Sequence, residues 1–232
     1  SDTYEMRLDD NWKAYCAIKD ALENGDDTPE SLARAVDLAR KVEQGTSLLF
    51  GFLLHLGESQ TEKHALTLLR KAVNLGIESE VEESQLLKAV SLTVGFGVLE
   101  QDVLELMADL SRKAGEAERQ AYALVLMAGN DEVEDSKFDE LARLCEKDIG
   151  DAEIAMSLID KVLEERPKHP ALRGVRKTLL RKMGKFTELA KLVEDELRDE
   201  KDPVLRQQAQ VEMANFLLDK KDREGAKKWL RE

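Results

Sequence analysis

The sequence predicts an all-α fold: a right-handed α-solenoid of antiparallel helix pairs, with about 13 helices. Apolar residues recur at three- and four-residue steps over most of the 232 residues, the pattern of helices with one buried side. The sequence has only 4 prolines, 5% of its residues are aromatic, and no run of alternating β-branched residues indicates a strand. Helices that are apolar on one side only must stack on neighbouring helices to exclude water.

The clearest stretch is 151–197, which reads as three short helices. In its first helix, Ala155 and Ile159 belong to one apolar stripe. Asp151 is suited to accept hydrogen bonds at the helix start, and Pro167 ends the helix because proline has no N–H to donate. This stretch therefore serves as the reference for the rest of the chain.

The same kinds of residue predict the other helices, which are described here in order from the N-terminus. Thr28 followed by Pro29 is a helix start, and glycines such as Gly57 and Gly76 are expected to end helices. The inward residues are expected to include Trp12, Phe52 and Val211, among others. The expected helices cover 9–23, 28–44, 47–56, 61–75, 81–95, 101–114, 116–128, 137–147, 151–166, 170–183, 186–197, 203–218 and 222–230.

Several residues resemble the pattern of the tetratricopeptide repeat (TPR), of a divergent bacterial type. Gly184-Lys-Phe186 stands at a turn, Ala155 and Leu189 lie 34 residues apart, and Pro167 and Pro203 close consecutive units. The resemblance implies helix pairs whose first helices line a concave groove that binds other proteins.

The repeat spacing is expected to break once. Equivalent positions lie 38 residues apart from Ala65 to Val103 and 37 apart from Leu189 to Ala226, whereas 52 residues separate Val103 from Ala155. We therefore expect TPR-like repeats in 1–130 and in 131–232, forming one continuous solenoid that is irregular near 129–136.

Composition argues against several classes of function. A net charge of −13 disfavours nucleic acid and anionic membranes as partners. The longest apolar run, 47–56, is about half as long as a membrane span. Cys16 and Cys145 form no CxxC pair, which favours a reducing, cytoplasmic location. Because the chain begins without Met, we expect a segment of a longer protein.

No catalytic or metal-binding pattern stands out, so we expect no enzyme, cofactor or metal. Histidines 55, 64 and 169 lack a metal-ligand grouping and read as packed or surface residues, although His55 and His64 could approach each other. Gly95-Phe-Gly97 lacks the features of a phosphate-binding loop and reads as a helix end. The acidic segment 131–140 lacks the central glycine of a calcium loop. It reads, with 78–83 and 194–202, as solvated turns and helix starts.

One stretch departs from its surroundings in charge. Residues 166–187 contain no Asp or Glu and eight Lys or Arg residues. Arginine side chains bind carboxylates with two donors, so an acidic segment of another protein is the partner that this stretch favours. The alternative is a solvated face paired to neighbouring acids such as Glu164, Glu165 or Glu194. The candidate groove residues are Arg173, Arg176, Lys177, Arg181 and Lys182.

Two functions remain open from the sequence. The first is a protein–protein interaction scaffold that binds an extended or helical segment of a partner in its concave groove. The second is a structural spacer or self-association segment, which forms homo-oligomers and has no groove ligand.

Overall fold

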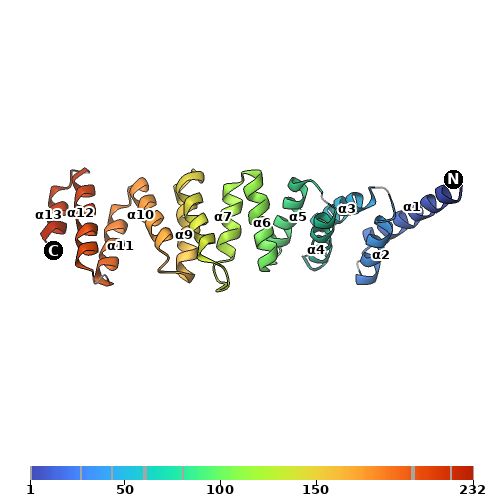
Figure 1. The fold of residues 1–232 in the computed structure, drawn as a ribbon, viewed down its shortest axis with the longest axis horizontal. Coiled ribbons are helices and arrows are strands. Elements are labelled where there is room, and N and C mark those ends of the chain that lie inside the picture. Colours follow the sequence, from blue (N-terminus) through green and yellow to red (C-terminus); the bar gives the residue numbers. More distant parts are fainter. Residues whose placement is uncertain are drawn as a thin grey trace. The chain divides into compact units, whose positions relative to one another are not determined.

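The structure, a computed structural model, describes residues 2–26, 28–42, 44–59, 62–79, 81–199, 202–219 and 221–231. All regular elements in these ranges are helical, which confirms the expected all-α class (Figure 1). The elements are α1 (Asp2–Glu23), α2 (Pro29–Ala39), α3 (Gly45–Ser59), α4 (Glu62–Glu78), α5 (Glu83–Gly95), α6 (Gln101–Ala114), α7 (Ala117–Leu126), α8 (Asp135–Arg143), the π-helical turn η1 (Leu144–Asp148), α9 (Ala152–Glu165), α10 (Pro170–Met183), α11 (Phe186–Asp199), α12 (Pro203–Asp219) and α13 (Arg223–Arg231).

The chain forms two compact units, Ser1–Met127 and Ala128–Glu232, and each is described by itself. In the first unit, the helices pack in chain order, from the α1–α2 pair to the α6–α7 pair. In the second unit, α9 to α13 pack in the same order, and α10 also packs on α8. Successive helices joined by short turns form hairpins, so each unit is a helical repeat.

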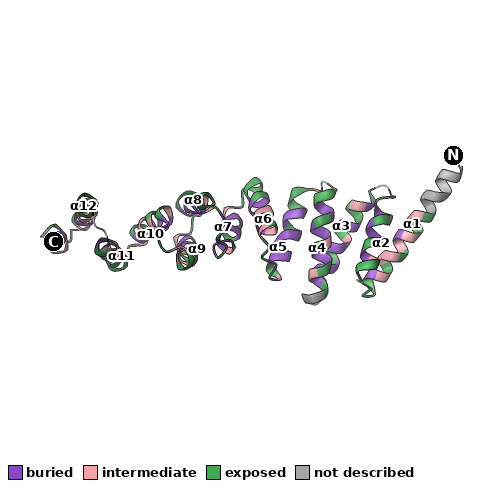
Figure 2. Cartoon of the chain, turned by 60° about the horizontal axis from the view of Figure 1, so that its bottom comes forward, coloured by how far each residue is buried: buried purple, intermediate pink, exposed green. Residues whose placement is uncertain are grey.

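Packing within each unit follows the apolar stripes. Ala155, Ile159 and Val162 on α9 and Leu189 on α11 have no exposed surface. Other helices also have one buried side: Figure 2 shows buried residues along one side of a helix and exposed residues along the other. Burying one large aliphatic side chain contributes about 1.5–3 kcal/mol, so stacking supplies the stability that a lone helix lacks.

Two consecutive hairpins in the second unit end their first helices in the same way. After α10, Gly184 has a φ of 71° and its N–H donates to Arg181 O over 3.2 Å. After α12, Lys221 has a φ of 64° and its N–H donates to Leu218 O over 2.9 Å. These two caps are 37 residues apart, the same spacing as between Leu189 and Ala226. The repeat register of the second unit is thereby defined by backbone geometry as well as by side chains.

The prediction that Gly57 and Gly76 end their helices was wrong. Helix α3 continues to Ser59 and α4 continues to Glu78. A Cβ at Gly57 would lie 2.7 Å from Leu69 Cγ, and one at Gly76 would lie 2.9 Å from the Phe50 ring. The missing side chains therefore let neighbouring helices approach closely. Thr61, the expected start of the fourth helix, lies outside the described residues.

The prediction that Trp12 and Val211 face the core was also wrong. Trp12 on α1 and Val211 on α12 are exposed, by 43% and 40%. In α3 the fully buried aromatic is Phe50, and Phe52 is only half-buried. Both α3 and α12 carry apolar residues around most of their circumference, so spacing alone does not identify the buried side.

The eighth helix ends earlier than the range 137–147 predicts. Helix α8 stops at Arg143, and the wider turn η1 follows, with the Ile149 N–H donating to Leu144 O over 2.9 Å. The five-residue spacing of this bond characterises a π-turn. Arg143 Nη1 donates to Asp148 Oδ2 across the turn, over 2.8 Å.

Ala155→Asp is expected to lower the free energy of unfolding of the second unit by about 3 kcal/mol, because it buries an unpaired carboxylate. Ser157→Asp, on the exposed side of the same helix, adds the same charge and is expected to change it by less than about 0.5 kcal/mol. Urea unfolding followed by circular dichroism measures both. Equal effects of the two variants would contradict the assigned burial of Ala155.

Lys221→Gly is expected to stabilise the second unit by about 1 kcal/mol, because glycine adopts a positive φ without steric cost. Lys228→Gly serves as the control: it lies within α13, where glycine is expected to cost about 1 kcal/mol. Thermal unfolding gives both values. A lower melting temperature for Lys221→Gly would contradict the left-handed cap.

Candidate functional site

Two of the candidate groove residues on α10 hold a single carboxylate. Arg173 Nε lies 3.0 Å from Glu196 Oε1, and Lys177 Nζ contacts Glu196 Oε2. Glu196 belongs to α11, which packs on α10. All three side chains are partly buried, with exposed fractions between 20% and 32%. Partial burial reduces solvent screening, so this cluster is stronger than a fully exposed pair.

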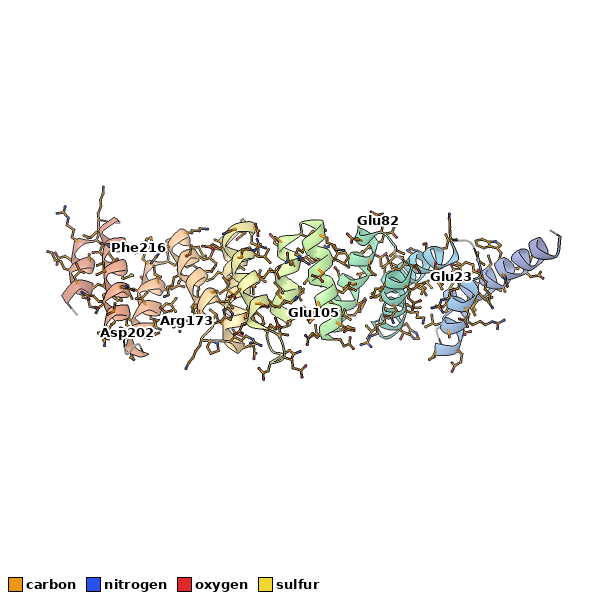
Figure 3. The ribbon with its side chains drawn as sticks, viewed as in Figure 1. Glu23, Glu82, Glu105, Arg173, Asp202 and Phe216 are labelled. Atoms are coloured by element: carbon orange, nitrogen blue, oxygen red, sulfur yellow. The ribbon has the colours of Figure 1, made fainter. Side chains whose placement is uncertain are left out.

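The remaining three candidates contact other neighbours. Arg176 Nε lies 2.8 Å from Asp160 Oδ1 of α9, without the alignment of a hydrogen bond. Lys182 Nζ donates to Glu146 O over 3.3 Å. Arg181 places its guanidinium 5.7 Å from the centre of the Phe216 ring on α12. Figure 3 shows Arg173 and Phe216 on their separate helices.

The acids that pair with Arg173, Arg176 and Lys177 are not the ones that the sequence analysis gave as examples. The examples were Glu164, Glu165 and Glu194, whereas Asp160 and Glu196 make these ion pairs. Partner choice depends on the angle and offset at which α10 crosses α9 and α11, which spacing within one helix does not define. The five residues are therefore distributed over the flanks of α10, where its neighbours supply acceptors.

Arg166 has a different role from the other basic residues. Its Nη2 donates to Asn130 O over 2.8 Å, and its Nε donates to Ala128 O over 3.2 Å. The same guanidinium lies 3.2 Å from Asp135 Oδ1 and 4.5 Å from the centre of the Phe138 ring. Because one planar group holds several points of the segment before α8, Arg166 fixes the acidic loop that precedes this helix.

His169 is adjacent to this cluster and is buried. It is the N-cap residue of α10, and its ring meets the Phe138 ring edge-on at 6.0 Å between centres. Its Nε2 lies 3.9 Å from Asp139 Oδ1, and its Nδ1 is buried without a hydrogen bond. The expectation of a packed histidine is thus confirmed here. His55 and His64 are exposed.

The two cysteines are free thiols. Cys145 lies in η1 and is buried, and this burial raises the pKa of its thiol to about 12. A buried group with a raised pKa stays protonated at neutral pH and is a poor nucleophile or metal ligand. In the described ranges, no group of three His, Cys, Asp or Glu side chains could hold a metal ion.

The sequence did not predict an apolar face on α12. Val204, Val211 and Leu218 recur every seven residues and are all exposed. Val204 and Val211, with Gln207 and Gln208 between them, line a shallow hollow of about 450 Å³. We call the exposed residues Val204, Gln207, Gln208, Val211, Asn215 and Leu218 the α12 face. The lack of charged residues at these positions could have revealed the face, because 36% of the residues in the chain are charged.

Comparison with family models and with curated proteins finds no match. Among solved structures, the chain is similar to a tetratricopeptide repeat protein from Parabacteroides merdae ATCC 43184. The two share 15% identity and a TM-score of 0.34, over 97% of this chain and 90% of that one. The helices of each unit pack on their neighbours in chain order, as in the helical repeat that the sequence predicts. No helix in the described part of the chain has the length and apolar character to span a membrane.

Arg166→Ala is expected to destabilise the second unit by about 2–3 kcal/mol, because carbonyl groups around the loop lose a charged donor. Arg166→Lys is expected to recover less than half of this, because one ammonium cannot reach the same acceptors. Limited proteolysis at 129–136 and urea unfolding measure the two effects. Full recovery by lysine would show that charge alone matters.

Proposed function

We propose that this chain is a protein-interaction scaffold without catalytic activity of its own. The fold supports this proposal because a helical repeat presents a long series of similar side-chain positions to a partner. The buried Cys145 thiol is in keeping with a reducing compartment such as the cytoplasm.

The partner that we propose for α10 is an acidic segment of another protein, bound by Arg173, Arg176, Lys177, Arg181 and Lys182. The observation that carries this proposal is the position of Glu196. Its carboxylate lies between Arg173 and Lys177, so these two cations are already arranged to receive one. An incoming Asp or Glu would exchange with Glu196 and make the same charge-assisted contacts.

The second candidate function is a spacer or self-association segment. The contacts that favour it are the same ion pairs, because Asp160 and Glu196 already neutralise part of the basic face. In that case the charges of α10 connect neighbouring helices and contribute to stability instead of binding a ligand.

A fluorescent peptide rich in glutamate distinguishes the two functions. Arg173→Gln combined with Lys177→Gln is expected to weaken its binding at least about tenfold, because both carboxylate donors are lost. Glu196→Gln is expected to strengthen binding about two- to fivefold, because the internal competitor loses its charge. Fluorescence polarisation at low salt measures the affinities.

The matched control is Arg112→Gln combined with Lys113→Gln, which removes two exposed charges from α6 in the first unit. It is expected to leave peptide binding unchanged. If this control and the α10 variant lose affinity equally, attraction by net charge explains the binding. No binding by any form would favour the spacer.

A further inference from the structure

Helix α10 contains an exposed glycine, Gly174, between its basic residues. A glycine inside a helix makes the helix less stable than an alanine would, because its backbone loses more conformational freedom on folding. Such a residue usually has a structural reason: a positive φ, the end of the helix, or close packing against a neighbour.

None of these three reasons applies to Gly174. Its φ is not positive, and α10 continues beyond it to Met183. A Cβ at Gly174 would meet no atom within 4 Å, whereas one at Gly57 or Gly76 would collide with a neighbouring helix. Within the described residues, the space next to Gly174 is therefore open, and no packed element requires it.

The open space lies beside the cations that hold a carboxylate. Gly174, Lys177 and Arg181 follow one another at three- and four-residue steps, so they share one side of α10. Arg173, the residue before Gly174, contacts Glu196 together with Lys177. The missing side chain is thus next to the point where a carboxylate is already bound.

This binding point is recessed. Only 20% of the Glu196 side chain and 29% of the Lys177 side chain are exposed. Asp and Glu have short side chains, so a partner's carboxylate can replace that of Glu196 only if the partner's backbone comes close to α10. A methyl group at residue 174 would occupy part of this approach, and glycine leaves it free.

We propose that Gly174 is a specificity-determining residue, which admits an extended acidic segment of a partner protein whose backbone passes over it. One carboxylate of that segment takes the place of Glu196 between Arg173 and Lys177. This inference rests on the proposed function and describes its partner more closely. A helical partner is disfavoured because its own side chains surround its backbone, whereas an extended chain can bring its backbone close.

Gly174→Ala is expected to have opposite effects on stability and on binding. It raises the melting temperature by about 2–4 °C, because alanine favours the helix. It weakens binding of the glutamate-rich peptide at least about fivefold, because the methyl group keeps the peptide backbone away from α10. Thermal unfolding and fluorescence polarisation measure the two effects, and a raised melting temperature excludes loss of folding as the cause of weaker binding.

The matched control is Gly51→Ala in α3 of the first unit. Gly51 is also exposed inside a helix, and a Cβ there would meet no atom within 4 Å. Helix α3 contains no Lys or Arg, so an open glycine occurs there without cations beside it. This variant is expected to raise the melting temperature by a similar amount and to leave peptide binding unchanged.

Two fluorescent peptides with the same number of glutamates test the conformation of the partner. One alternates Glu with Pro and is extended, and the other combines Glu with Ala and is held helical by a side-chain crosslink. The wild-type chain is expected to bind the extended peptide at least about fivefold more tightly, and Gly174→Ala is expected to reduce this preference.

The inference and the proposed function fail separately. Unchanged binding by Gly174→Ala, with binding lost in the Arg173→Gln and Lys177→Gln variant, overturns only the role of Gly174. Equal or tighter binding of the helical peptide overturns the extended partner. A lower melting temperature for Gly174→Ala would show that the fold itself needs the glycine, which also overturns the inference. Unchanged binding in the Arg173→Gln and Lys177→Gln variant, or no binding by the wild-type chain, overturns the α10 site and this inference with it.

Discussion

The structure depends on one constraint: a helix that is apolar on one side can bury that side only against other helices. Ala155 and Leu189 have no exposed surface because α9 and α11 each lie against α10. No strand takes part in this packing within the described residues. Each contact is local in sequence, so stability builds up from one hairpin to the next.

Charged side chains lie beside the buried apolar stripes, where they are partly exposed to solvent. Asp160 and Glu196 come to α10 from the two helices on either side of it, and each meets a basic side chain there. Arg166 contacts several groups at once, and its guanidinium fixes the backbone of the acidic loop before α8. In the structure, residues of the basic stretch thus contact carboxylates, a backbone carbonyl, an aromatic ring and the loop before α8.

The sequence was sufficient to predict the helices and their order, because stripes such as Ala155 to Val162 and stops such as Pro167 depend on local chemistry. It failed where the outcome depends on the crossing of two helices. Glu196 could not be preferred over Glu194 as the partner of Arg173, because the distance between α10 and α11 decides it. Val211 was assigned to the core because α12 is apolar on several sides, and only packing shows which side stays open.

The matching caps at Gly184 and Lys221 also bear on how such a chain can change in length. They lie 37 residues apart and have the same backbone conformation, so a segment cut at the two caps begins and ends in the same geometry. Duplication or deletion of that segment joins equivalent ends and needs no new turn. The second unit is in this sense modular, and a genetic exchange at either cap would alter the number of hairpins while preserving how each one meets the next.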